Sequence, residues 1–326
     1  MAERKYGTVM YRQNLSHILE IFRVVPGDGE RFPPHVAGQY ISLSKENCKL
    51  TRKIVDEKGN VWYVPDIDES GDRRRGTVTH SYSIASAPYE TEENHYLEFY
   101  VLLETVEQGE PGRLSESLFH LDPETDNRLY YIDNITGDFT LEKRAAGYPN
   151  VVLAGSGTGL APFASMIKQL HHDSMQGRIH PERYTLFQTN RTYEELGYHK
   201  IFLEIEAAQR FDFVYVPTVS RPTQRDCDDP HVGRGRGNNV LRSILEMSSK
   251  EEEDYRAVRG SGGDIDRKMQ DKSVEAALPK SVSKELLLER MEPSRTVILA
   301  CGNSGFMADV KKIAGRINVP FEKEEW

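Results

Sequence analysis

An apolar run ends in three alternating glycines at residues 151–163, VVLAGSGTGLAPF. Glycines at alternate positions let the backbone turn sharply and approach a ligand without an intervening Cβ. Pro162 suits the first turn of a helix, where no N–H donor is needed. The order predicts a buried strand, a tight turn and a helix N-terminus, which favours a phosphate. Leu160 replaces the last glycine of the dinucleotide fingerprint, so the glycines alone also fit an ordinary strand–turn–helix junction.

Strands and helices alternate after Pro149. The pattern predicts strands at 151–154, 184–188, 213–218 and 296–300, and helices at 162–171, 200–209, 239–247 and 305–317. Strands separated by helices predict an α/β doubly wound parallel sheet, which binds ligands at the carboxyl ends of its strands. A charged stretch at about 248–286 interrupts this scheme and predicts a mobile, solvated insertion.

The part before the glycine turn has a different rhythm. Short alternations predict strands at 8–11, 19–25, 39–43, 81–85, 97–103 and 128–132, and only 114–121 has helical spacing. Six strands without a long helix predict an antiparallel six-stranded β-barrel. Residues 45–79 leave the pattern and predict an insertion with a hairpin tip at 58–60, a return strand at 61–64 and an exposed basic loop at 71–76. We therefore expect two domains, residues 1–147 and 148–326.

Composition excludes several classes of protein. A net charge of −9 disfavours nucleic acid as a partner, because phosphate binding needs an electropositive face. No apolar run approaches the roughly 20 residues of a transmembrane helix, and no signal core follows the N-terminus, so we expect a cytoplasmic protein. Cys48, Cys227 and Cys301 are too far apart for a zinc or iron–sulfur site, and we expect no metal.

Two stretches in the predicted barrel have the chemistry of a flavin site. Residues 80–83, HSYS, lie on a predicted strand, where Tyr82 can lie flat against an aromatic ring system and Ser83 can donate a hydrogen bond to it. Residues 112–115, GRLS, begin the predicted helix, whose N–H groups and Arg113 can hold a pyrophosphate. The plainer alternatives are a sheet surface and a helix cap.

Candidate nicotinamide-binding residues follow the predicted parallel strands. Cys301 ends a buried strand beside the glycine turn, although a lone cysteine is often a small core residue. Arginines follow the second and third strands, in the stretches 188–193, 219–221 and 233–239. Clustered arginines suit a 2′-phosphate, whereas an acidic residue favours the NAD ribose. Because no carboxylate stands at the end of the second strand, we expect NADP rather than NAD.

In order and approximate spacing, these stretches resemble the ferredoxin–NADP reductase family, and most of all its bacterial branch. The resemblance covers almost the whole chain. The family's flavin motif Arg-x-Tyr-Ser is similar to His80-Ser81-Tyr82-Ser83, its pyrophosphate motif to Arg113-Leu114-Ser115, its nicotinamide-side turn to 155–162 and its Cys-Gly motif to Cys301-Gly302-Asn303. The chain also ends on an aromatic residue, Trp326, as members often do.

The resemblance implies a barrel that binds FAD and an α/β domain that binds NADP(H). It implies that Tyr82 stacks on one face of the isoalloxazine ring and Trp326 on the other, until nicotinamide displaces Trp326. Ser83, Thr158 and Cys301 would line the place where hydride passes. The expected FAD set is His80, Ser81, Tyr82, Ser83, Tyr100, Val101, Leu102, Arg113, Leu114, Ser115, Thr158 and Trp326. The expected NADP set is Gly157, Thr158, Asn190, Arg191, Ser220, Arg221, Arg234, Arg236, Cys301, Gly302 and Asn303.

His80 departs from the family pattern, in which an arginine pairs with the FAD phosphates. A neutral imidazole offers one donor where a guanidinium offers a charged fork. Arg74, Arg75 or Arg113 would have to compensate.

The resemblance implies an enzyme in which NADPH reduces FAD, which passes single electrons to a ferredoxin or flavodoxin, or the reverse. Ferredoxins are usually acidic, so Arg73, Arg74 and Arg75 are the candidate docking surface. Two alternatives stay open: an NAD(P)H-dependent flavin reductase component that serves an oxygenase or another acceptor, and a flavin-binding subunit of a larger complex. The sequence leaves the oligomeric state open.

Overall fold

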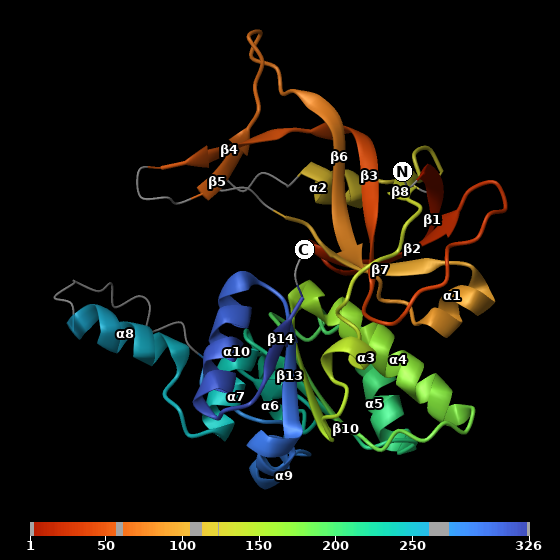
Figure 1. Ribbon diagram of the computed structural model, residues 1–326. Coiled ribbons are helices and arrows are strands. Elements are labelled where there is room, and N and C mark those ends of the chain that lie inside the picture. Colours follow the sequence, from red (N-terminus) through yellow and green to blue (C-terminus); the bar gives the residue numbers. More distant parts are fainter. Residues whose placement is uncertain (1–2, 57–60, 105–112, 123, 261–273, 325–326) are drawn as a thin grey trace. The chain divides into compact units, whose positions relative to one another are not determined.

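A computed structural model describes residues 3–56, 61–104, 113–122, 124–260 and 274–324. The chain divides between Asp138 and Phe139 into two compact units, each with its own sheet (Figure 1). Within the described part of the chain, every helix is too short or too polar to span a membrane.

The N-terminal unit is built on an antiparallel six-stranded sheet, as the strand pattern predicted. Its order is β6-β3-β8-β1-β2-β7. The strands are β1 (Arg4–Ser16), β2 (Leu19–Pro26), β3 (Tyr40–Lys49), β6 (Arg75–Ser83), β7 (Leu97–Leu102) and β8 (Arg128–Ile132). The two outer strands approach each other just beyond β6, where the Ala85 N–H donates to the Glu98 carbonyl at 2.8 Å. The sheet therefore curves into a half-barrel around one hydrophobic core.

The segment predicted as an insertion is partly barrel strand. β3 continues to Lys49 and β6 begins at Arg75, so both ends of residues 45–79 remain paired in the main sheet. Between them, β4 (Thr51–Val55) and β5 (Val61–Pro65) form a separate antiparallel hairpin. The predicted hairpin tip at residues 58–60 lies outside the described residues. Helices α1 (Pro88–Asn94) and α2 (Arg113–Phe119) complete the unit.

The C-terminal unit is the predicted doubly wound parallel sheet, in the order β12-β11-β10-β9-β13-β14. The strands are β9 (Asn150–Ser156), β10 (Arg183–Asn190), β11 (Phe213–Val219), β12 (Gly233–Arg234), β13 (Thr296–Cys301) and β14 (Phe321–Lys323). The four predicted helices are α4 (Ala161–Met175), α5 (His199–Ala208), α7 (Gly237–Ile244) and α10 (Ser304–Arg316). Side chains of α7, α9 (Lys284–Arg290) and α10 share one core with β9 and β13, and α4 and α5 lie on the other side of the sheet (Figure 1). Short elements α3 (Leu141–Arg144), η1 (Gly157–Leu160), α6 (Gln224–Asp228) and η3 (Pro293–Arg295) connect them.

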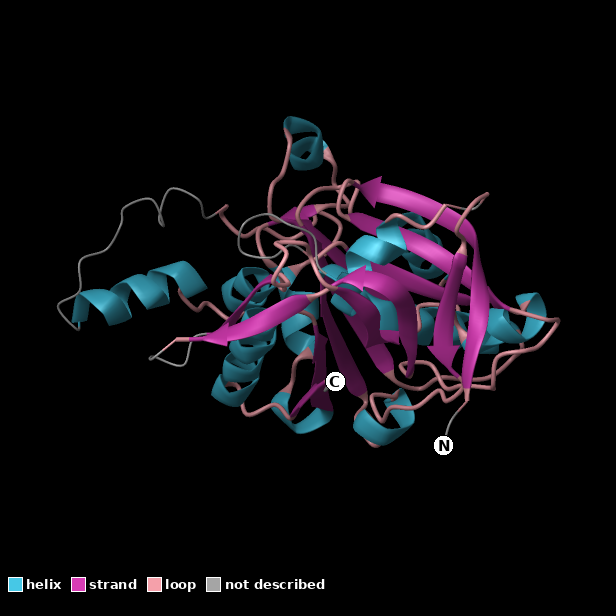
Figure 2. Ribbon diagram, turned by 90° about the horizontal axis from the view of Figure 1, so that it is seen from above, coloured by secondary structure: helices cyan, strands magenta, loops and turns pink. Residues whose placement is uncertain are grey.

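One helix forms in the charged stretch at about 248–286, which the sequence predicted as a mobile, solvated insertion. Helix α8 (Lys250–Gly260) extends beside α7 and α10 (Figure 1, Figure 2). Its start carries a reciprocal cap, because the Glu252 N–H donates to Ser249 Oγ and the Ser249 N–H donates to Glu252 Oε2, both at 3.2 Å. The Ser-x-x-Glu spacing is the signal that predicts such a start, and apolar periodicity alone overlooks it.

Candidate functional site

The glycine turn brings the ends of two neighbouring strands into close contact. β9 leads through the turn η1 directly into α4, in the predicted order of strand, turn and helix. Gly157 has a φ of +58°, which favours glycine. A Cβ on Gly159 would lie 2.2 Å from the Cys301 carbonyl oxygen at the end of β13. Glycine at 159 is therefore what allows Cys301 to pass this close to the start of α4.

Cys301 lies beside this turn as a buried thiol with a carboxylate partner. Its Sγ donates to Glu324 Oε2 at 2.8 Å, and Cys301 is almost fully buried. Burial first, and then the charge of Glu324, raise the pKa of the Cys301 thiol well above its usual value. The group is a protonated donor at neutral pH. Glu324 was missed in the sequence, because it carries no motif and comes close only through the pairing of β14 with β13.

The predicted 2′-phosphate residues gather at one edge of the parallel sheet. The Ser220 N–H donates to the Asn190 carbonyl at 3.0 Å, and the Arg221 N–H donates to the Arg191 carbonyl at 2.8 Å, so the chains after β10 and β11 run side by side. The start of α7 meets the same edge, since a Cβ on Gly237 would lie 2.4 Å from Thr189 Oγ1. We call Arg191, Arg221, Arg234 and Arg236 the arginine group.

Two members of the arginine group already bind carboxylates. Arg191 Nε donates to Glu195 Oε2 at 3.0 Å, and its Nη2 donates to Glu195 Oε1. Arg236 Nη1 donates to Glu251 Oε1 of α8 at 2.9 Å. Arg221 is exposed, and Arg234 Nη1 lies 3.9 Å from Cys227 Sγ.

The expectation that no carboxylate stands at the end of the second strand was therefore wrong. The chain turns back after β10, where the Glu195 N–H donates to the Thr192 carbonyl at 3.2 Å, and this turn returns Glu195 to Arg191. Residues 191–195 form a turn and not a helix, so the four-residue spacing that pairs side chains on a helix gave no signal for this contact.

In the N-terminal unit, the structure brings Arg113 to His80, on the same strand face as Tyr82. His80 and Tyr82 share one face of β6, opposite Leu43 and Ile41 of β3. Arg113, the first residue of α2, places its Nη2 3.3 Å from His80 Nε2. Burial, followed by the charge of Arg113, lowers the pKa of His80, which is therefore neutral at pH 7. Arg113 thus lies beside the histidine for which the sequence required a compensating charge.

Tyr82 is held at the margin of the barrel core. Its ring meets Phe99 edge-on, with the ring centroids 6.4 Å apart and the planes at 80°. Burial raises the pKa of its phenol well above the usual value, so the ring is neutral at physiological pH.

The other predicted flavin-site residues have mixed surroundings. Ser115 is buried, and its Oγ accepts the Glu104 N–H at 3.0 Å. Leu114 and Val101 belong to the hydrophobic core, Ser83 and Tyr100 are buried, Leu102 is exposed, and Ser81 is half-buried.

On the nicotinamide side, Gly157, Thr158 and Gly302 are half-buried, and the Oδ1 of Asn303 caps α10 by accepting the Phe306 N–H. Trp326 lies outside the described residues.

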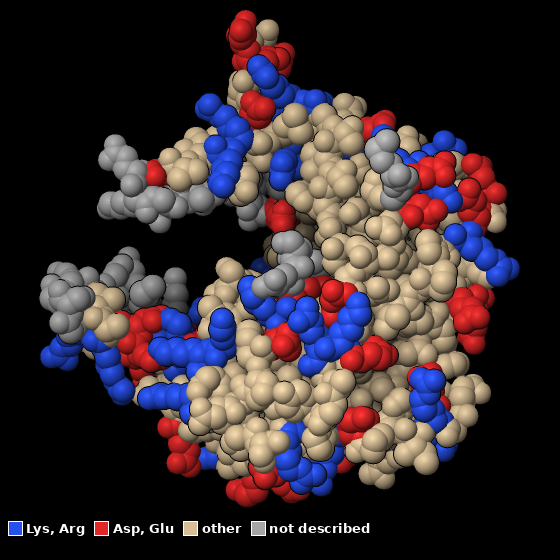
Figure 3. All heavy atoms as spheres, in the orientation of Figure 1, with Lys and Arg blue, Asp and Glu red and all other residues tan. Residues whose placement is uncertain are grey.

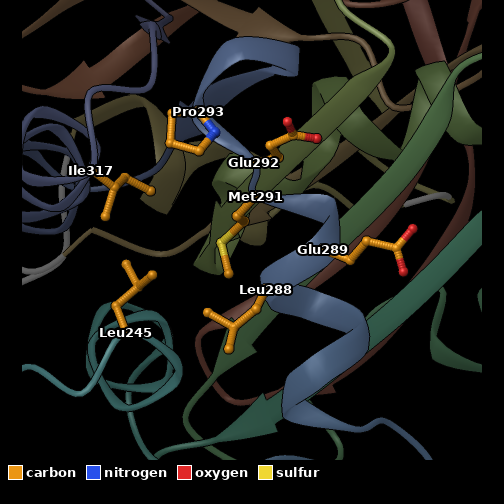
Figure 4. Close-up of a pocket in the computed structure, with 7 residues that line it drawn as sticks. All are labelled: Leu245, Leu288, Glu289, Met291, Glu292, Pro293 and Ile317. Carbon is orange, nitrogen blue, oxygen red and sulfur yellow. The ribbon is translucent and has the colours of Figure 1, made fainter.

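A hydrophobic pocket of about 470 Å³ lies elsewhere in the C-terminal unit (Figure 4). It opens where α7, α9 and α10 end, on the side of the sheet from which the strands begin. Leu245, Leu288, Glu289, Met291, Glu292, Pro293 and Ile317 line it. None of the predicted site residues takes part in this pocket. Among the residues that the structure describes, no cluster of acidic, histidine and cysteine side chains has the composition of a metal site.

Comparison with known proteins agrees with the two-unit fold described above. Residues 153–255 match the family model described as the oxidoreductase NAD-binding domain. A search of curated proteins gave no match.

Solved structures extend the likeness to both units. A ferredoxin NADP+ reductase from Neisseria gonorrhoeae with bound FAD and NADP is 17% identical, with a TM-score of 0.57 over 99% of each chain. The FAD/NAD binding domain of nitric oxide dioxygenase from Vibrio cholerae O1 biovar El Tor is also 17% identical, with a TM-score of 0.56 over 98% of each chain. The cytochrome b5 reductase domain of Ulva prolifera nitrate reductase is 15% identical, with a TM-score of 0.52 over 98% of this chain and 97% of that one. At these identities the likeness shows the fold alone: an antiparallel sheet unit followed by an α/β unit with a parallel sheet, as the strand patterns predicted.

Proposed function

We propose that this chain is an FAD-dependent oxidoreductase that exchanges a hydride with NADP(H) and single electrons with a ferredoxin or flavodoxin. The observation that carries the proposal is the contact between Gly159 and Cys301, at the carboxyl ends of two parallel strands. Ligands bind such sheets at this edge. Gly159 lies within residues 153–255, the stretch that matches the oxidoreductase NAD-binding domain.

The N-terminal unit has a donor set that fits FAD. Arg113 would pair with the pyrophosphate, and neutral His80 beside it would add one uncharged hydrogen bond. Tyr82 would orient the isoalloxazine ring by stacking, because its own ring is fixed edge-on by Phe99. Ser83 would donate a hydrogen bond to the ring edge. FAD, when bound, supplies the exchange between two-electron and one-electron chemistry.

The C-terminal unit would hold the nicotinamide nucleotide along the carboxyl edge of its sheet. The N–H groups at Gly157 and Thr158 would bind the pyrophosphate, and Arg191, Arg221 and Arg236 of the arginine group would bind the 2′-phosphate. Cys301 would keep its proton at the reacting end of the nucleotide, because its thiol is buried and donates to Glu324.

The first test is the absorption spectrum of the purified chain, before and after anaerobic NADPH. We expect the bands of oxidised flavin, and their bleaching by NADPH faster than by NADH. Tyr82→Leu should release FAD, whereas Tyr130→Leu, a half-buried tyrosine on another strand of the same sheet, should retain it. A protein that takes up no FAD contradicts the proposal, and a yellow protein that NADPH leaves unbleached indicates a flavin-binding subunit instead.

The electron acceptor distinguishes the proposal from its nearest alternative. The structural relatives include reductases named for different acceptors, which is why a reductase component serving another acceptor is the second candidate. We expect NADPH-dependent reduction of ferredoxin or flavodoxin under anaerobic conditions. Reduction of ferricyanide without reduction of either protein would favour the second candidate.

A further inference from the structure

Helix α8 places a carboxylate against the arginine group. Glu251 Oε1 accepts from Arg236 Nη1 at 2.9 Å, and its Oε2 accepts from Asn239 Nδ2 at 2.7 Å. Asn239 is itself fixed, because its Oδ1 accepts the Lys250 N–H at 2.9 Å. The carboxylate of Glu251 therefore bridges two residues at the start of α7.

The position of Glu251 is set by an anchor two residues further along α8. Glu253 Oε2 accepts from Arg242 Nη2 at 2.7 Å, and Arg242 binds Asp309 of α10 through Nε at 2.8 Å. Lys312 of α10 donates to Glu253 Oε1 at 2.5 Å. Figure 3 shows basic and acidic side chains next to one another over α8 and α10. Ion pairs thus hold the first turn of α8 to both neighbouring helices.

Arg236 joins the edge of the sheet where the nucleotide phosphate is expected. The Gly235 N–H donates to the Val219 carbonyl at 2.9 Å, and Gly237 packs on Thr189. Arg236 lies between these two contacts. Its side chain is 66% exposed, whereas that of Glu251 is 19% exposed. The arginine is free to turn toward a ligand, while the carboxylate stays bound to Asn239.

We infer that Glu251 is a specificity-determining residue. Its carboxylate weakens the preference of the nucleotide site for nucleotides that carry a 2′-phosphate. A bound 2′-phosphate and the Glu251 carboxylate would compete for one guanidinium, and two anions on the same cation repel each other. A nucleotide with a free 2′-hydroxyl carries no such penalty. The first turn of α8, at the start of the charged segment that interrupts the α/β pattern, is thereby part of the nucleotide site. This inference rests on the nucleotide-binding function proposed above.

The test is isothermal titration of the full-length protein with adenosine 2′,5′-bisphosphate and with 5′-AMP. Glu251→Gln keeps the size of the side chain and removes its charge. We expect it to tighten the binding of the bisphosphate about threefold to tenfold, the range of a partly exposed ion pair, and to leave that of 5′-AMP unchanged. Glu252→Gln is the matched control, since Glu252 is exposed and bonds only to the helix cap among the contacts described for it. It should change neither affinity.

A double mutant separates competition for Arg236 from a general change in charge. In an Arg236→Gln background, Glu251→Gln should no longer tighten bisphosphate binding, because the contested cation is gone. An unchanged ratio of the two affinities in Glu251→Gln, equal tightening of both ligands, or weaker bisphosphate binding would each overturn the inference. Failure of the unmutated protein to bind either ligand would instead overturn the nucleotide site itself.

Discussion

Gly159 is the residue at which the geometry of the candidate site is most sharply constrained. The Cys301 carbonyl and the Gly302 nitrogen both lie within 2.5 Å of where its Cβ would be. These are backbone atoms at the end of β13, so relief requires a strand to move rather than a side chain to turn. A small residue at position 159 is therefore needed for the end of β13 to lie against the turn that leads into α4.

We expect Gly159→Ala to destabilise the protein by about 1–3 kcal/mol, the usual cost of overpacking a filled site. Urea unfolding of the two proteins measures it. Gly315→Ala in α10 is the control of opposite sign, because no atom lies within 4 Å of its Cβ. It should stabilise by about 0.5–1 kcal/mol, since alanine is the better helix former. Equal stability of Gly159→Ala and the unmutated protein would contradict the contact described here.

At the scale of elements, α8 is held by charge where the other helices of the sheet are held by apolar packing. Arg242 is almost fully buried between Asp309 of α10 and Glu253 of α8. A buried guanidinium needs such partners, because an unpaired charge in the interior is costly. Helix α7 therefore connects Arg242, which anchors α8, to Arg236 of the arginine group.

The anchor predicts a pH dependence. Lys312, followed by Arg242, lowers the pKa of Glu253 from 4.5 to about 2. A carboxyl whose pKa is lower in the folded protein stabilises the fold above pH 4.5, and this contribution is lost as the pH falls toward 2. Because Glu253 is one-third exposed, solvent screening reduces the effect to about 1 kcal/mol.

We therefore expect Glu253→Gln to lower stability by about 1 kcal/mol at pH 7 and to flatten the loss of stability between pH 4.5 and pH 2. Urea unfolding at a series of pH values measures both effects. Glu252→Gln removes the same charge at the neighbouring exposed position and should leave the profile unchanged. An identical acid profile in Glu253→Gln would show that the ion pairs do not hold α8.

At the scale of the whole molecule, the net charge is −9, so an acidic partner would have to meet a local group of basic side chains. The three arginines that the sequence predicted as a docking surface differ in exposure. Arg73 is half-buried, and its Nε donates to the Leu50 carbonyl at 3.3 Å, whereas Arg74 and Arg75 are exposed. Arg73 therefore links the chain before β6 to Leu50, between β3 and β4. Arg74 and Arg75 are the exposed members of the predicted docking surface, and Arg75 Nη1 also donates to the Asn47 carbonyl at 3.0 Å.

We expect the double variant Arg74→Gln/Arg75→Gln to slow the reduction of an acidic ferredoxin at low salt, and to weaken the dependence of the rate on ionic strength. Stopped-flow measurements over a salt series give both quantities. Reduction of ferricyanide, a small acceptor with no protein surface to dock, should keep most of its rate. An unchanged salt dependence would place the docking surface elsewhere.

The sequence predicted the fold because the two patterns that define it, the strand alternation of the N-terminal part and the strand–helix alternation of the C-terminal part, are local. Alternation at 19–25 and the alternating strand and helix pattern after Pro149 follow from residues a few positions apart, so the two sheets and their strand directions were predicted correctly. The helix α8 was missed for the same reason: ion pairs with Arg242 and Arg236 hold it, and these contacts leave no apolar period.

The sequence by itself determined the two kinds of sheet, the glycine turn and the residue types that suit a flavin and a nicotinamide nucleotide. Only the tertiary structure decided which polar side chains meet: Arg113 beside His80, Glu324 beside Cys301, Glu195 beside Arg191 and Glu251 beside Arg236. The physical reason is that side-chain periodicity depends on neighbouring residues along the chain, whereas hydrogen bonds and ion pairs depend on distances in space, which β-strand pairing and helix packing set across tens or hundreds of residues.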